Sequence, residues 1–191
     1  WTQESLEKSG VEVVLNSIVS DLDDESVTYK TKDGELVRVE ANCKVWAAGV
    51  QANELGRTLA EQSGAEIDRA GRVVVLPDCS LPGHPEVTVI GDLAFVKGVP
   101  GVAQGAVQEA KYVAKRIAAR ANGQPVDDKP FEFFDKGSMA TISKFSAVVK
   151  VGKMRVTGFV AWVMWLILHL LYIAGFKSRV TTLLHWVISF L

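Results

Sequence analysis

The 191-residue sequence has few of the residues that usually mark a metal site, a disulfide framework or a nucleic-acid surface. Its two cysteines, Cys43 and Cys79, form no CxxC pair, so a reducing compartment is the default expectation. The three histidines lack the spacing of metal ligands, and no Ser, His and Asp arrangement stands out. The net charge is −1 and no basic stripe is present. These absences argue against metal catalysis, triad hydrolysis and nucleic-acid binding.

The most informative stretch that is present lies around Gly91-Asp92. The β-branched run Val87–Ile90 predicts a buried strand, and it stops at this dipeptide. Gly91 lets the backbone approach a ligand, and the carboxylate of Asp92 can accept hydrogen bonds from hydroxyl groups. After a Gly- and Pro-containing loop, a helix is predicted to begin at about Val102, and its N-terminus suits an anionic or electron-rich group. The pattern predicts a cofactor cradle, with an ordinary turn as the alternative.

The start of this helix carries two glutamines among small residues. Gln104 and Gln108 are four residues apart, so both lie on one helix face. Ala103, Gly105 and Ala106 are small enough to let a flat ring come close. This composition suits a helix that borders a planar ligand.

The same stretch resembles the second flavin-binding segment of the two-dinucleotide-domain flavoprotein reductases. Ala103–Gln108 also matches the AQxAxQ motif of one branch, the type II NADH dehydrogenases (NADH:quinone oxidoreductases), and suggests a bacterial member. The resemblance implies that Asp92 holds a ribityl hydroxyl of FAD. It also implies cofactor contacts for Gly91, Ala103 and Gln104, and for Gly49 at the end of a Trp-Ala-Ala-Gly crossing between domains. A plain turn glycine is the alternative for Gly49.

A second matching segment is Lys136–Ile142, which fits the Lys-Gly-x-x-Ala-x-Ile segment that lies beside the flavin in this family. The resemblance implies that Lys136 contacts the flavin and that Gln104, Gln108 and Lys136 line the quinone site. An ordinary hairpin lysine is the alternative for Lys136. Ser143 stands where the family usually has Gly, which leaves the geometry of the following turn open.

The GxGxxG phosphate loop expected near the start of such a flavoprotein is absent. The sequence also begins at Trp1, without Met or a targeting signal, inside a predicted helix. We therefore expect a C-terminal portion of a longer protein whose missing part holds both pyrophosphate loops.

The fold class predicted is α/β, as part of a Rossmann-like flavoprotein with a C-terminal helical tail that docks on a membrane. We expect the end of the NADH-binding domain at 1–49, the C-terminal part of the FAD-binding domain at 50–125, a β segment at 126–155 and membrane-associated helices at 156–191. Local patterns predict helices over 1–10, 55–63 and 102–121. Strands are predicted at Val11–Leu15, Ser26–Lys30, Leu36–Glu40, Cys43–Ala48, Gly71–Leu76, Val87–Ile90, Phe131–Phe134, Met139–Ile142 and Ala147–Val151.

The tail from Val156 to Phe176 has no formal charge, and as one helix it would be about 31 Å long. Four amphipathic residues nevertheless form a stripe along its length: Trp162, Trp165, His169 and Tyr172. Because a spanning helix keeps Trp and Tyr at its two ends, the stripe favours a helix that lies flat in the interface. The alternative is that the stripe packs on the catalytic domain or on a partner subunit. We expect a peripheral protein that contacts membrane lipid on the cytoplasmic face of the cell membrane.

Taken with the resemblance, these patterns predict an FAD enzyme that passes electrons from NADH to menaquinone or ubiquinone without pumping protons. A sulfide:quinone reductase is a weaker alternative because it needs cysteines at the flavin. A ferredoxin reductase is disfavoured by the membrane tail. A non-catalytic, membrane-bound fragment is a third alternative. The sequence does not fix the oligomeric state, and a homodimer stays open.

Overall fold

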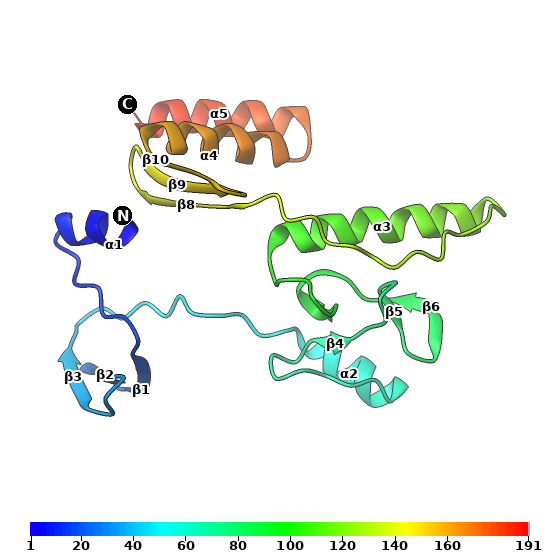
Figure 1. Ribbon diagram of the computed structural model, residues 1–191, viewed down its shortest axis with the longest axis horizontal. Coiled ribbons are helices and arrows are strands. Elements are labelled where there is room, and N and C mark those ends of the chain that lie inside the picture. The colour runs from blue at the N-terminus through cyan, green and yellow to red at the C-terminus, as the bar shows by residue number, and fades with distance from the viewer. Residues whose placement is uncertain (191) are drawn as a thin grey trace. The chain divides into compact units, whose positions relative to one another are not determined.

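The structure is a computed structural model that describes residues 1–190 (Figure 1). It divides into two compact units, one formed by Trp1–Trp46 with Lys136–Leu191 and the other by Ala47–Asp135. Both contain helices and strands, so the predicted mixed α/β composition is confirmed.

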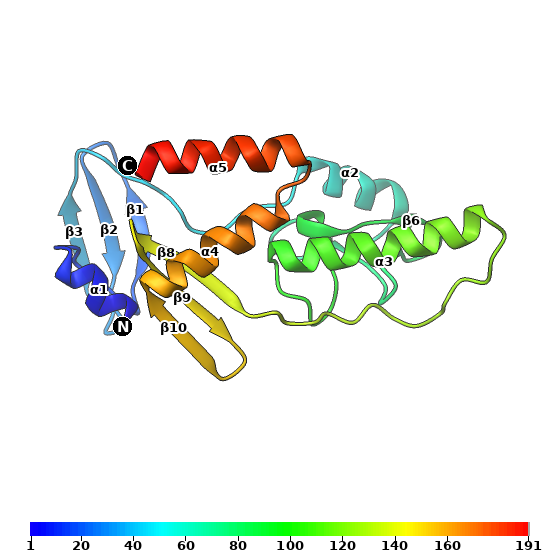
Figure 2. The same cartoon turned by 90° about the horizontal axis from the view of Figure 1, so that it is seen from above.

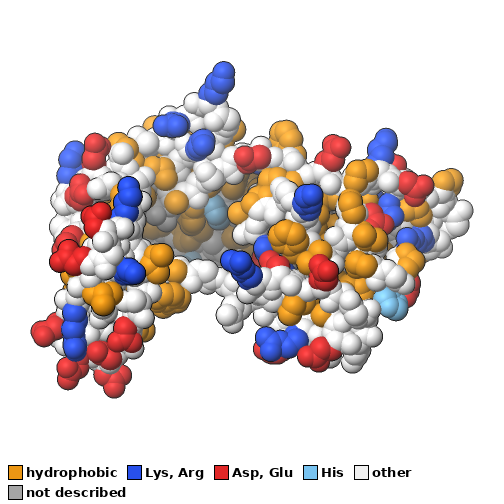
Figure 3. Space-filling view, turned by 60° about the horizontal axis from the view of Figure 1, so that its bottom comes forward, with side chains coloured by type: hydrophobic (Ala, Val, Ile, Leu, Met, Phe, Trp, Pro, Cys, Tyr) orange, Lys and Arg blue, Asp and Glu red, His pale blue; other side chains and the backbone are white. Residues whose placement is uncertain are grey.

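The first unit begins with helix α1 (Thr2–Lys8) and a three-stranded antiparallel sheet of β1 (Ile18–Leu22), β2 (Ser26–Lys30) and β3 (Leu36–Glu40). The predicted hairpin is confirmed to the residue, with Gly34 at a φ of 89° in its turn. Carboxylates gather over this part of the surface (Figure 3).

Two strands predicted beside this sheet are wrong. Neither Val11–Leu15 nor Cys43–Ala48 forms a strand, and Asn16, with a φ of 55°, turns the chain just before β1. The physical reason is pairing: β1 reaches β2 through a short turn, whereas the two predicted segments find no neighbouring strand.

The second unit contains helix α2 (Glu54–Ser63), two small sheets and the long helix α3 (Ala103–Ala121). Asn53 caps α2 by accepting a hydrogen bond from the Leu55 N–H at 3.0 Å, and Gly64 ends it with a φ of 74°. The strands are β4 (Val73–Val74) parallel to β7 (Ala94–Phe95), and β5 (Ser80–Leu81) antiparallel to β6 (His84–Thr88).

The core of the second unit gathers side chains from these strands and from α3, including Val73, Cys79, Leu81 and Val113. The strand predicted at Gly71–Leu76 is shortened to Val73–Val74, and β6 ends before Ile90. The extended chain then enters a single 3-10 turn, η1 (Gly91–Leu93).

In the C-terminal part of the first unit, β8 (Ser138–Ser143), β9 (Ser146–Val151) and β10 (Met154–Gly158) form an antiparallel meander. The β8 and β9 predictions are confirmed. At the turn where Ser143 replaces the expected Gly, the positive φ of 64° falls on Phe145, and the strand register shifts between Thr141 and Ser143.

Two helices follow the meander, α4 (Phe159–Tyr172) and α5 (Phe176–Phe190). The single helix expected over Val156–Phe176 is therefore wrong at both ends: β10 continues to Gly158, whose φ of 75° precedes α4, and α4 ends at Tyr172. In the part of the chain from 1 to 190, no helix combines the length and the apolar character needed to cross a membrane.

Residues 124–135, which we call the strap, connect α3 to Lys136. The strap runs back along α3 in an extended form (Figure 2). The strand predicted within it at Phe131–Phe134 is wrong, since no strand lies beside it. Its main chain is held by side chains of α3 instead.

Candidate functional site

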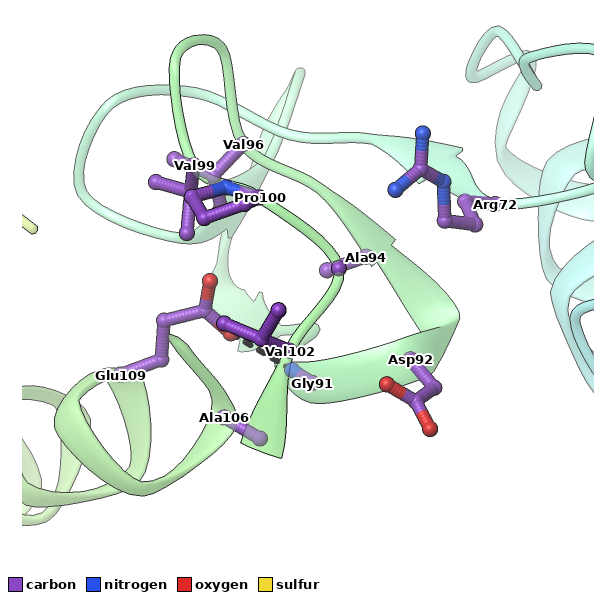
Figure 4. A pocket seen from close by; sticks show the side chains of 11 residues that line it. Arg72, Gly91, Asp92, Ala94, Val96, Val99, Pro100, Val102, Ala106 and Glu109 are labelled. Atoms are coloured by element: carbon purple, nitrogen blue, oxygen red, sulfur yellow. Dashed lines mark hydrogen bonds between the residues drawn. The ribbon is translucent and has the colours of Figure 1, made fainter. Parts of the chain in front are cut away.

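A small hollow lies where η1, the loop before α3 and the first turns of α3 meet (Figure 4). Gly91 and Asp92 line it from η1, and Ala106 and Glu109 line it from the helix. Gly91 has a φ of 67°, and a Cβ added there would lie 3.3 Å from the Cβ of Ala106. Glycine is therefore required both by the backbone conformation and by the approach of the helix.

Glu109 holds this turn against α3. The residue is 4% exposed, and its carboxylate accepts a hydrogen bond from the Gly91 N–H at 2.6 Å. Burial raises the pKa of Glu109, the hydrogen bond from Gly91 opposes that shift, and the nearby charge of Asp92 adds to it. Sequence reasoning missed Glu109. A signal was present, because Glu109 lies four residues after Gly105 on the core-facing side of the helix, where an ionisable residue is expected to be buried.

The N-terminus of α3 lacks a side-chain cap. The N-cap residue is Val102, whose carbonyl accepts the Gly105 N–H at 2.9 Å. A Cβ on Gly105 would lie 3.1 Å from the Pro100 carbonyl, so glycine lets the helix start close to the loop. The Oε1 atom of Gln104 is buried and has no hydrogen-bond partner within residues 1–190. A buried acceptor of this kind calls for a donor from outside the described chain.

The amide of Gln108, unlike the Oε1 of Gln104, has hydrogen-bond partners. Its Nε2 donates to the Phe134 carbonyl and its Oε1 accepts from the Phe134 N–H, both at 3.0 Å. The carbonyl oxygen and one N–H of its amide are therefore engaged, one helical turn after the unsatisfied Oε1 of Gln104.

The remaining predicted residues lie elsewhere. Gly49, with a φ of 74° and open space where a Cβ would be, belongs to the second unit but does not line the hollow. Lys136 belongs to the first unit, where its Nζ donates to the Tyr172 hydroxyl at 3.1 Å. The structure thus brings Gly91 and Asp92 to the helix that starts with Ala103 and Gln104.

The cysteines are not arranged for redox chemistry. Cys79 is fully buried, and burial together with the charges of Glu109 and Asp78 raises its pKa to about 12. Cys43 is exposed, and both thiols are free. The described residues also contain no group of His, Cys, Asp and Glu suited to a metal ion.

Comparison with protein families places this site in a known context. The pyridine nucleotide-disulphide oxidoreductase family matches residues 1–110, more than half of the chain. The chain belongs to this family. The predicted family resemblance is thereby confirmed, and the hollow at Gly91-Asp92 lies within the matched region.

Two curated family members from Mycobacterium tuberculosis are similar over almost the whole chain. The type II NADH:quinone oxidoreductase Ndh is 58% identical over 97% of the chain and 40% of its own length. The type II NADH:quinone oxidoreductase NdhA is 54% identical over 99% of the chain and 41% of its own length. The chain thus spans about two fifths of the length of these relatives.

A solved structure shares the fold. NDH2 from Plasmodium falciparum, determined in complex with NADH, matches 99% of the chain and 52% of its own with a TM-score of 0.78 at 16% identity. This likeness confirms the predicted Rossmann-like α/β fold at the level of architecture.

Proposed function

We propose that the chain forms part of an FAD-dependent type II NADH:quinone oxidoreductase, which passes electrons from NADH to a membrane quinone without pumping protons. The observation that carries this proposal is the 58% identity to a protein of that name over 97% of the chain. The family match and the Gly91-Asp92 hollow support it.

The residues of the hollow fit FAD. Gly91 lacks the side chain that would block close approach, and the exposed carboxylate of Asp92 can accept a ribityl hydroxyl. The uncapped start of α3 at Ala103 offers N–H groups and a positive dipole end to the electron-rich edge of a flavin. The buried Oε1 of Gln104 suits the imide N–H that such a ring carries. Bound FAD would supply the two-electron acceptor for the hydride of NADH.

For the quinone side we propose Gln104 and Lys136, together with Gln108, whose contribution is described in the next subsection. A glutamine amide has no acidic proton, so protons for the quinone must come from water or another group. The ammonium of Lys136 is held beside the Tyr172 hydroxyl and 5.8 Å from its ring centroid. For Gly49 we retain the proposed approach to the nucleotide.

The two C-terminal helices are proposed to contact membrane lipid from the cytoplasmic face. Their mutual surface includes an apolar groove of about 330 Å³, and several outward side chains are strongly exposed, such as Phe176 at 82% and Ile188 at 74%. Exposed apolar side chains in this density are typical of a membrane or protein contact. A homodimer is the assembly that we would test first.

A sulfide:quinone reductase is less well supported, because that chemistry needs reactive cysteines. The thiol of Cys79 is buried with a strongly raised pKa, and Cys43 lies in the other unit.

The proposal is tested with the purified full-length protein. We expect it to release FAD on denaturation and to oxidise NADH in the presence of a short-chain quinone. With sulfide as the electron donor in place of NADH, we expect little reduction of the quinone. A colourless protein, or one whose flavin NADH does not reduce, would overturn the proposal.

A further inference from the structure

We propose that Gln108 serves electron transfer as a positioning residue, which fastens the strap to α3 through the main chain of Phe134 rather than by touching the quinone. The inference deepens the proposed function and rests on it. It starts from a row of contacts along one face of α3.

Three side chains on this face bind main-chain atoms of the strap. Gln108, Tyr112 and Arg116 are spaced four residues apart, so they lie above one another along the helix. The Tyr112 hydroxyl donates to the Lys129 carbonyl at 2.6 Å, and Arg116 donates to the Asp127 carbonyl. With the pair of bonds at Gln108, the row follows the strap antiparallel to the helix (Figure 2).

The strap depends on these bonds because it has no secondary structure of its own. Backbone polar groups need partners, and an isolated extended segment does not supply them. Phe131 adds a further hold, since its N–H donates to the Pro77 carbonyl at 2.7 Å and its ring lies 5.6 Å from that of Tyr112. The strap is therefore fixed along α3 by several independent contacts.

Gln108 makes the contact nearest to the end of the strap. Its amide donates and accepts at a single residue, Phe134, as a neighbouring β-strand would do. The Oε1 of Gln108 and one of the two N–H groups on its Nε2 are thus bound to Phe134, so the strap fixes the orientation of this amide.

The position of Phe134 gives the contact its meaning for function. Phe134 is two residues before Lys136, which the proposed function assigns to the quinone side. The next residue, Gly137, has a φ of 94°, and a Cβ there would clash with the Lys150 carbonyl. Lys136 thus follows a main-chain anchor by two residues and precedes a position that tolerates no side chain. Loosening the anchor should let Lys136 sample more positions.

The experiment compares Gln108→Leu, Gln108→Glu and Tyr112→Phe in the holoenzyme, with Lys115→Ala on the exposed face of α3 as the matched control. Leucine removes both bonds to Phe134, glutamate keeps only the acceptor, and phenylalanine removes one bond farther along the strap. Hydrogen exchange of the strap and the two half-reactions are measured separately.

We expect Gln108→Leu to speed exchange of the Phe134 amide about tenfold and to lower kcat for quinone reduction by a similar factor, since two net hydrogen bonds are lost. Gln108→Glu should retain part of the exchange protection and part of the kcat for quinone reduction. Tyr112→Phe should speed exchange of the strap and lower this kcat by about threefold each. Flavin reduction by NADH in a single turnover should stay normal in every variant. Lys115→Ala should match the wild type.

Two results would overturn the inference. One is a Gln108→Leu variant that loses quinone reduction while the strap keeps its protection from exchange. The other is a change in the KM for quinone in Gln108→Leu whose size differs between quinone head groups and which is absent in Tyr112→Phe. Such a change would indicate that Gln108 contacts the quinone directly. Failure of the proposed function looks different, because the wild-type holoenzyme would then reduce no quinone although its strap stays protected.

Discussion

Helix α3 and the pair α4–α5 are held in place by different forces. Side chains of α3 bind main-chain atoms of distant segments, as Glu109 does with Gly91 and Gln108 with Phe134. Side chains of α4 and α5 meet mainly through rings and aliphatic groups, with Trp162 between Phe145 and Phe190 at centroid distances of 4.9 Å. Hydrogen bonds specify one register, whereas apolar contacts tolerate repacking. The position of α3, the helix proposed to hold the flavin, is thus fixed more precisely by its contacts than the positions of α4 and α5 are by theirs.

The largest effect should come from the apolar side of this comparison. Trp162 is 7% exposed and is central to the aromatic cluster. Trp162→Ala should lower the free energy of unfolding by about 3–5 kcal/mol, because it leaves a large cavity. Urea denaturation followed by circular dichroism measures the loss. Leu171→Ala, at a side chain 63% exposed, is the control and should change stability by less than about 0.5 kcal/mol. Equal losses would show that the cluster is not the core of this unit.

A smaller effect is expected from the polar row of α3. The Arg116 side chain is 13% exposed and lies 3.0 Å from the Asp78 carboxylate and 5.5 Å from the Tyr112 ring centroid. Arg116→Ala should lower the free energy of unfolding by about 2 kcal/mol, because it removes charge-assisted bonds at a partly buried site. Arg116→Lys keeps the charge but not the forked geometry and should lose roughly half as much. A loss no greater than that of Lys115→Ala would contradict the role given to this row.

The smallest effect that we expect is a dependence of the free energy of unfolding on pH, caused by Glu109 of α3. Because the pKa of Glu109 is raised by burial, the folded chain binds its proton more tightly than the unfolded chain does. This contribution to stability is complete below the pKa of an unfolded glutamate, about 4.3, and is lost as pH rises through the raised value. The titratable groups near Glu109 are Asp92 and Cys79, and neither reverses the direction of this pH dependence. The charge of Asp92 also raises the pKa of Glu109, and the pKa of Cys79 is itself raised to about 12.

Glu109→Gln keeps an acceptor for the Gly91 N–H and cannot ionise. Its stability relative to the wild type should therefore increase as pH rises from about 4.5 to 7.5, which urea midpoints at several pH values would show. Parallel pH profiles for the two proteins would contradict a raised pKa for Glu109.

The elements predicted well from sequence are those whose signals are local. Lys32-Asp33-Gly34 defines its hairpin, Gly64 ends α2, and the 3–4 spacing of apolar residues marks α3. Each of these depends on residues close together in the chain.

The elements predicted wrongly depend on partners far away in the sequence. Phe131–Phe134 has the composition of a strand, but its main chain pairs with α3 side chains instead of another strand. The first helix of the tail is predicted to begin at Val156 because the lack of charge extends back to this residue, but the chain from Met154 to Gly158 pairs with β9 as strand β10. Pairing of this kind cannot be read from a local pattern.

The candidate site divides in the same way. Gly91, Asp92 and Gln104 were predicted from motif and helix position, and they lie around the start of α3. Glu109 was missed because an ionisable residue within a helix is usually solvent-exposed, and its burial against Gly91 is a tertiary contact. The assignment of these residues to FAD and quinone stays a prediction.

The affinity of the full-length apoprotein for FAD, measured for wild type, Asp92→Asn and Asp92→Ala, tests the central claim most directly. If Asp92 holds the ribityl chain, loss of a charge-assisted hydrogen bond should raise the Kd for FAD about 10- to 100-fold in Asp92→Ala and less in Asp92→Asn, which keeps an acceptor. Unchanged affinity in both variants, with the fold intact by circular dichroism, would contradict the placement of the flavin at Gly91-Asp92.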